Sequence, residues 1–195
     1  MNGKLILIAL IIGLFAVSAA FASDEYEIDA VHSSIGFSVR HLMISNVTGN
    51  FNDFSGKLLF DENDLTKSSI EIEIKSASIN TNNEGRDNHL RAADFFNVEK
   101  FPAITFKSSK VEKSGETYVL FGTFTMHGVS KEISIPFEFI GKIKGPDGKQ
   151  RLGFEGSTKL DRKDFGITWN KTLDEGGIAV GNEVKVQLNI EAVKK

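Results

Sequence analysis

The sequence predicts an all-β protein made of antiparallel strands. Apolar and polar residues alternate with a period of two along most of the chain, which is the pattern of strands with one buried face. Turn-forming residues such as "KGPDGK" (144–149) separate these runs, and most connections are too short to hold a crossover helix. About eight or more strands of this kind must stack as a sandwich or close into a barrel, and the alternation leaves both architectures open.

Residues 1–22 have the features of a secretory signal peptide. Lys4 precedes an uninterrupted apolar run of 13 residues, 5–17, and Ala20-Phe21-Ala22 provides an A-x-A cleavage site. The run is shorter than the roughly 20 residues that a membrane-spanning helix needs. We therefore expect cleavage after Ala22, export to the periplasm or beyond, and no membrane span in the mature chain. An uncleaved anchor is the alternative, because apolar residues continue to Ala22.

The remaining chain, 23–195, is expected to form one domain. Its length suits a single hydrophobic core, and no linker or repeat divides it. The chain has no cysteine, which excludes disulfides, thiol chemistry and cysteine-based metal sites. The formal net charge of −3 at pH 7 gives no electrostatic case for binding nucleic acid.

The alternation is clearest in four runs. In residues 34–41, Ile35, Phe37 and Val39 share one face of the strand. The runs 69–75, 131–139 and 183–191 repeat the pattern with Ile, Val, Leu and Phe, and weaker runs add further strands. In chain order the expected strands are 26–31, 34–41, 47–51, 54–61, 69–75, 103–111, 117–126, 131–139, 151–160 and 183–191.

One segment interrupts the strands. The apolar positions change parity near Ser76, which a β-bulge or a bend in the strand explains. Residues 84–96 then form the longest stretch compatible with a helix, since Leu90 and Ala93 fall at helical spacing. A short helix between the strands of a barrel covers one of its open ends.

Five blocks of the sequence carry a resemblance to a known family. They occur in the family's order and span nearly all of 23–195, so the match does not depend on one short motif. The departures are small: Tyr26 stands where Trp is frequent, and Met126-His127 stands where other members vary. The chain resembles the YceI-like family, secreted bacterial proteins associated with polyisoprenoid binding, in "YEIDAVHSSIGFSVRH" (26–41), "VTGNFNDFSG" (47–56), "GRDNHLRAADFFNVEKFPAITFKS" (85–108), "GTFTMHGVSK" (122–131) and "DRKDFGI" (161–167).

The resemblance implies an extended, eight-stranded, antiparallel, lipocalin-like barrel with a short helix near one end. Barrels of about eight strands are either just filled by side chains or hold one small ligand, and the sequence does not decide between these. The helix region contributes residues that close the barrel end, contact the ligand, or do both. The expected ligand-binding residues are Phe37, Val39, His41, Ile72, Ile74, Leu90, Phe95, Phe96, Phe106, Ile135, Phe137 and Phe139.

The polar candidates are histidines and arginines. The four histidines lie on separate predicted elements with no metal-binding spacing, so no metal site is expected. Adjacent residues of an extended chain point to opposite faces, which argues against a hydrolase pair of His32 and Ser33. Arginine binds phosphate or carboxylate with its planar fork, but the neighbouring aspartates favour internal Arg–Asp pairs at the rim. The candidates for contacting a ligand head group are His32, Arg86, His89 and Arg162.

These observations favour non-catalytic binding or carriage of a long apolar ligand, a polyisoprenoid or similar fatty lipid, without a cofactor. One alternative is an enzyme that modifies an isoprenoid lipid, with His32, His41 or His89 as the general base. The other is a ligand-free barrel that acts through its surface as an adaptor or stress-response protein. Such barrels are commonly dimers, so a homodimer is left open.

Overall fold

The computed structural model of the chain describes residues 23–173 and 177–195. The predicted signal peptide, 1–22, and most of the predicted turn at 174–177 lie outside these residues. Within them, no helix is both long enough and apolar enough to cross a membrane.

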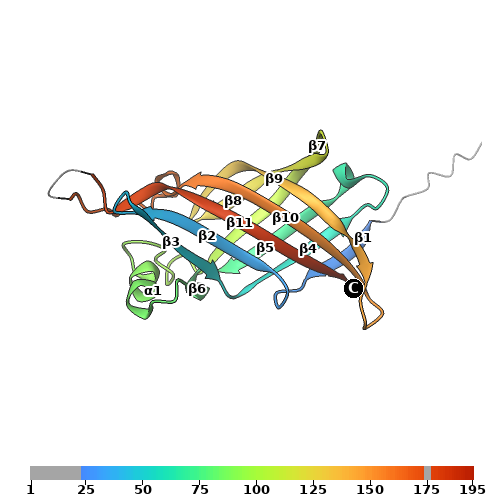
Figure 1. Ribbon diagram of the computed structural model, residues 1–195, viewed down its shortest axis with the longest axis horizontal. Coiled ribbons are helices and arrows are strands. Elements are labelled where there is room, and N and C mark those ends of the chain that lie inside the picture. The colour runs from blue at the N-terminus through green and yellow to red at the C-terminus, as the bar shows by residue number, and fades with distance from the viewer. Residues whose placement is uncertain (1–22, 174–176) are drawn as a thin grey trace, which may run out of the picture.

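Eight strands close into an elongated antiparallel barrel (Figure 1). Each strand hydrogen-bonds to the next, and the last pairs with the first. The predicted all-β barrel with a short helix near one end is therefore confirmed. The strands, in their order around the barrel, are β1 (Asp24–Ile28), β4 (Phe54–Phe60), β5 (Ser69–Lys75), β7 (Ala103–Ser114), β8 (Thr117–Met126), β9 (Val129–Lys144), β10 (Gln150–Asp161) and β11 (Val180–Lys194).

Strand β11 is long enough to pair with two strands on the same edge. Its end pairs with β1, where Ala192 faces Ile28, and its earlier part pairs with β2 (Ser34–His41), where Leu188 faces Ile35. The sheet continues from β2 to β3 (Ser45–Phe51) and then to β6 (Ile79–Asn80). Thus β1 and β2 together line one side of β11, and β2, β3 and β6 extend the wall at the end of the barrel that carries the helix (Figure 1).

The alternation located the strands well. The observed bounds of β2, β5 and β8 are those expected from the sequence. Strands β9 and β11 are longer than the predicted runs 131–139 and 183–191, because a bulge in the pairing of β9 with β10 and another in that of β2 with β11 let the ladders continue.

The change of parity after β5 is a bend. Residues Ser76–Ser78 form a short 3-10 turn, η2, which re-aims the chain into β6. The backbone N–H of Ser76 donates to the carbonyl of Pro102, so the bend is held against the start of β7. Two further 3-10 turns are η1 (Leu65–Lys67) and η3 (Arg162–Phe165).

Helix α1 (Glu84–Arg91) is shorter than the predicted helix 84–96. Asn83 caps its N-terminus, where the Asn83 side-chain oxygen accepts the backbone N–H of Arg86. It ends at Ala92, whose ψ of 172° is extended. The spacing of apolar residues therefore overestimated the helix, and the chain continues through a series of hydrogen-bonded turns that include Asn97 in the left-handed region.

Two hydrophobic clusters occupy opposite ends of the barrel. The first, which we call the base cluster, surrounds Tyr26, Leu58, Phe60, Leu152 and Ala192, near the C-terminus. The second lies beneath α1 and extends inward, and includes Phe95, Phe165 and Ile167.

Replacing Gly122 tests how closely the strands of the barrel wall pack. A Cβ on this glycine would lie 2.4 Å from the carbonyl oxygen of Lys107 and 2.7 Å from the Phe106 ring, so Gly122→Ala should lower the free energy of unfolding by about 2 kcal/mol. Gly153→Ala is the control, because its Cβ would meet nothing closer than 3.5 Å. Urea unfolding of both variants measures the effect. Equal stability of the two would contradict the observed packing.

Candidate functional site

The barrel encloses a cavity of about 230 Å³. Inward-facing residues from most of the barrel strands and from β2 form its wall, and most of them are Phe, Ile, Leu or Val. An engineered apolar cavity of about 150 Å³ stays dry and binds benzene, so this one is large enough to hold an apolar guest. Among the residues on the wall are Phe37, Ile72, Leu120, Phe124, Ile133, Phe137, Phe154, Val184, Val186 and Leu188.

The burial of these residues indicates a hollow interior. Phe37, Ile72, Phe124 and Phe137 all lie on the cavity wall, yet each is only partly buried. In a filled barrel such side chains would be fully covered by their neighbours, as Leu152 is in the base cluster. The inward faces of the middle of the barrel therefore border open space.

The structure brings most of the predicted ligand-binding residues together on one wall. Ten of the twelve line the cavity, although no ligand contact is tested for any of them. These ten are Phe37, Val39, Ile72, Ile74, Leu90, Phe95, Phe96, Phe106, Ile135 and Phe137.

His41 and Phe139 do not line the cavity. His41 is the last residue of β2, beside the hairpin turn and beyond Val39, which is the last wall residue of that strand. Phe139 lies in the base cluster, with its ring centroid 5.6 Å from that of Phe60 and 5.3 Å from that of Phe154. Alternation indicates which face of a strand a residue occupies, but not its depth along the barrel.

The turns after α1 close one end of the cavity. Phe95 is buried, with its ring centroid 5.1 Å from that of Trp169, and Phe96 meets Phe51 edge to face at 5.8 Å. Both also line the cavity, as Leu90 does. Closing the end and lining the wall are therefore done by the same side chains.

The predicted Arg–Asp pairs are not formed. Arg86 donates to the hydroxyl and the carbonyl of Thr81, at 2.7 and 2.9 Å, and Asp87 accepts from the backbone N–H of the same threonine. Arg91 donates to the carbonyls of Ala77 and Ile79, both at 2.8 Å. These irregular segments present free carbonyls, and the guanidinium groups bind them in place of a carboxylate. Neither arginine lines the cavity.

Arg162 is a buried cation on the cavity wall. Its side chain donates to the backbone carbonyls of Ile167 and Trp169, both at 2.8 Å, and to those of Val180 and Gly181. It is 4% exposed, and burial lowers the pKa of its guanidinium group. No carboxylate is among its hydrogen-bond partners in the described part of the chain. Arg162 therefore ties the segment after η3 to the start of β11.

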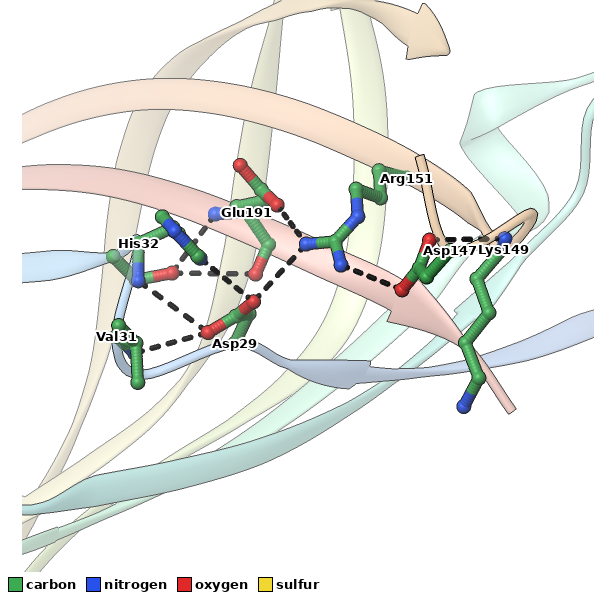
Figure 2. A network of polar contacts seen from close by, with 8 residues as sticks. Asp29, Val31, His32, Asp147, Lys149, Arg151 and Glu191 are labelled. Atoms are coloured by element: carbon green, nitrogen blue, oxygen red, sulfur yellow. Dashed lines mark hydrogen bonds and ion pairs between the residues drawn. The ribbon is translucent and has the colours of Figure 1, made fainter. Parts of the chain in front are cut away.

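His89 and His32 both lie away from the wall. The ring of His89 packs edge to face on Trp169 at a centroid distance of 5.2 Å, and its Nε2 lies 3.3 Å from Asp94 Oδ2. His32 lies near the opposite end of the barrel, where its Nδ1 is 2.9 Å from Asp29 Oδ2 (Figure 2). Neither is placed to touch a ligand in the cavity.

The His32 network joins three parts of the chain. Arg151 Nη1 lies 3.1 Å from Asp29 Oδ2 and also contacts Glu191, while its Nη2 lies 2.8 Å from Asp147 Oδ2 (Figure 2). The ligand atoms of Asp29, His32 and Glu191 lie within 4.8 Å of one another, a spacing compatible with a metal ion. Because the guanidinium group already binds both carboxylates, we describe the group as an ion-pair network that fastens the β1–β2 loop to β10 and β11.

Several wall residues were not singled out from the sequence. Val184, Val186 and Leu188 follow the alternation of the run 183–191, and Ile133 follows that of 131–139. The same signal that selected Ile135 and Phe137 therefore also marked these four. Only the closure of the barrel shows that they face one common space.

A family model described as "YceI-like domain" matches residues 26–192. Among the relatives, a UPF0312 protein of Photorhabdus laumondii is 40% identical over 182 residues, which cover 93% of this chain and 92% of the relative. A UPF0312 protein of Pseudomonas aeruginosa is 39% identical over 196 residues, which cover 98% and 99% of the two chains.

Solved structures give the same fold. The YCEI protein of Campylobacter jejuni superposes with a TM-score of 0.69 at 39% identity, covering 80% of this chain and 90% of that one. BcnA of Burkholderia cenocepacia gives a TM-score of 0.74 at 20% identity, covering 84% and 98%. A polyisoprenoid-binding domain of Saccharophagus degradans gives a TM-score of 0.63 at 15% identity, covering 87% of this chain and 98% of that one. At these two lower identities the likeness concerns the fold alone.

Replacing Arg162 tests its role as an anchor. Lysine cannot reach several carbonyls at once, so Arg162→Lys should lower the free energy of unfolding by at least about 2 kcal/mol. The exposed neighbour Lys163 provides the control, and Lys163→Ala should change stability little. Urea unfolding is the measurement. An Arg162→Lys protein as stable as the native one would show that the four hydrogen bonds are dispensable.

The His32–Asp29 contact should make stability depend on pH. The hydrogen bond to Asp29 raises the pKa of His32, so the contact stabilises the fold fully below the unfolded pKa of about 6.5 and less as pH rises through the folded value. The melting temperature of the native protein should therefore exceed that of His32→Asn by more at about pH 5.5 than at about pH 8.5.

The control for this prediction is Asp29→Asn, which removes the partner. In that background, His32→Asn should show no such pH dependence. A pH dependence that persists without the Asp29 carboxylate would contradict the assignment of the effect to this pair.

Proposed function

The chain belongs to the YceI-like domain family, and from this premise we propose that it binds a long apolar lipid, a polyisoprenoid or a related chain, without covalent chemistry. The ligand occupies the barrel cavity. The observation that carries the proposal is the open interior of the barrel. Its wall is almost wholly apolar, and large side chains on that wall, such as Phe37, Phe124 and Phe137, remain partly exposed.

The physical basis is hydrophobic burial. Each methylene removed from water contributes about 0.8 kcal/mol, so a chain of many carbons gains affinity in this cavity without any catalytic group. The barrel is elongated (Figure 1), and the cavity is lined both by Phe60 of the base cluster and by Phe95 and Phe96. Lining residues this far apart suit a thread-like molecule better than a compact one. The polyisoprenoid-binding protein of Saccharophagus degradans shares this fold and supports the ligand class.

The head group is proposed to lie near Arg162. Guanidinium has five N–H donors, and four hydrogen bonds to carbonyls leave one on Nη2. A phosphate or carboxylate at this end would accept that donor and offset a buried charge that has no carboxylate partner among the described residues. His32, Arg86 and His89 lie away from the wall and are not part of this proposal.

The other hypotheses have no specific observation in their favour. The histidines considered as general bases, His32, His41 and His89, do not line the cavity, so a lipid bound there would be out of their reach. A barrel acting only through its surface does not require an open apolar interior. We further propose that residues 1–22 direct export to the periplasm and are then removed. A homodimer stays an untested prediction.

The direct test is to extract the purified protein under denaturing conditions and to analyse the extract by mass spectrometry. We expect a long-chain lipid at close to one molecule per chain. Repeated absence of any lipid, together with failure to bind an added polyprenyl lipid, would refute the proposal.

A second test fills the cavity from one wall. Val186 faces the cavity, so Val186→Trp should reduce bound lipid by at least about tenfold, because the indole takes up ligand volume. Its neighbour Gln187 is exposed, and Gln187→Trp should leave lipid content unchanged. Lipid content is measured by extraction, and folding by thermal denaturation. Equal lipid content in the two variants would place the ligand elsewhere.

A further inference from the structure

The turn between β2 and β3 carries three consecutive exposed apolar residues. Leu42 is 38% exposed, Met43 59% and Ile44 82%. They are three of the seven large apolar residues that are exposed in the described part of the chain, and the other four are scattered singly or in pairs. Single exposed apolar residues are ordinary, but a run of three at one turn calls for an explanation.

The backbone of this turn makes the choice of residues more unusual. Leu42 and Met43 have φ values of 48° and 64°, and the N–H of Ile44 donates to the carbonyl of His41, which together define a type I′ turn. Such turns favour Asn-Gly, because positive φ is costly for residues with a large side chain. Neither the turn geometry nor core packing therefore accounts for Leu and Met at these positions.

A second loop lies against the turn. The N–H of Leu42 donates to the carbonyl of Ala179, and Met43 and Leu173 both lie close to Gly177. The β2–β3 turn lies at the same end of the barrel as α1 (Figure 1). We call Leu42, Met43 and Ile44 the apolar tip.

The apolar tip is continuous with the cavity wall. Val39, three residues before Leu42, lines the cavity, and so does Val180, which pairs with His41. Arg162, on the same wall, holds the carbonyl of Val180. The tip is thus an extension of the end of the barrel at which the proposed head group lies.

We propose that the apolar tip inserts into the surface of a lipid bilayer and docks the barrel there for uptake and release of its ligand. This inference rests on the proposed function, since an insoluble chain must enter from a membrane and return to one. Three side chains cannot supply the roughly 1,000 Å² that a stable protein interface buries. Apolar side chains of this kind embed readily at the boundary of head groups and acyl chains.

Charge at the base of the tip favours anionic lipid. Arg40 and Lys171 are exposed, and neither takes part in an ion pair among the described residues. Asp174 and Glu175 follow in the sequence and lie outside those residues. We expect insertion of the apolar tip to supply most of the binding free energy. The two cations add a preference for negatively charged head groups.

The test is flotation of the purified protein with lipid vesicles. Vesicles of phosphatidylethanolamine with phosphatidylglycerol, and vesicles of phosphatidylcholine alone, separate the contributions of charge and insertion. The variant Leu42→Asn/Met43→Gly/Ile44→Thr places the preferred Asn-Gly pair in the turn, so it should fold at least as stably as the native protein. Its vesicle-bound fraction should fall by at least about tenfold.

Ile143 provides the matched control, because it is 70% exposed near the end of β9, where it pairs with Arg151, which in turn pairs with Val193 near the C-terminus. Ile143→Ser should float like the native protein. The inference is overturned if native protein does not float, if the tip variant floats as well as native, or if Ile143→Ser loses as much binding. A dimer that depends on the tip and does not bind vesicles would also overturn it, in favour of a contact between two copies.

Lipid content separates this inference from the proposed function. A tip variant that no longer floats and contains less extracted lipid than the native protein, yet still binds an added polyprenyl lipid, supports both. Native protein that floats through its tip but never contains lipid would refute the carrier function and leave membrane docking standing.

Discussion

The structure depends on one constraint, the double pairing of β11. Its end pairs with β1 and closes the ring, while its earlier part pairs with β2 and lengthens the wall toward α1. A closed ring satisfies the backbone hydrogen bonds of its strands without an exposed edge. The wall is thus held by its ladder as well as by core packing, which allows the middle of the barrel to stay open.

Apolar side chains close both ends of the barrel interior and exclude water from it. The base cluster, with Tyr26, Phe60 and Leu152, fills the end near the C-terminus. The Phe95–Phe96 turns cover the other end, and Arg162 holds the segment after η3 to β11 by four carbonyl contacts. Packing is therefore concentrated where water would enter, and the side chains between the two ends border open space. The ion-pair network around Arg151 does not line the cavity and fastens the β1–β2 loop.

Much of the architecture could be predicted from the sequence, because alternation specifies the face of each strand. It located β2, β5 and β8 to the residue and assigned wall residues such as Phe37 and Ile135 to the inner face. It could not give depth, which is why His41 was assigned to a wall that ends at Val39. Nor could it separate a filled barrel from a hollow one, since that depends on closure and on how side chains from distant strands meet. The arginine partners were mistaken because adjacency to aspartate says nothing about the carbonyls that irregular segments bring close.

The central claim is that a lipid chain lies along the inner wall of the barrel. Methyl-labelled NMR of the protein with an added polyprenyl lipid tests it most directly, because inward and outward methyl groups are resolved in one experiment. The account predicts intermolecular NOEs from the ligand chain to Ile72, Val186 and Leu188, with none to the exposed Ile140 and Ile143. Contacts confined to the outward methyl groups, with the inward ones unchanged, would contradict it.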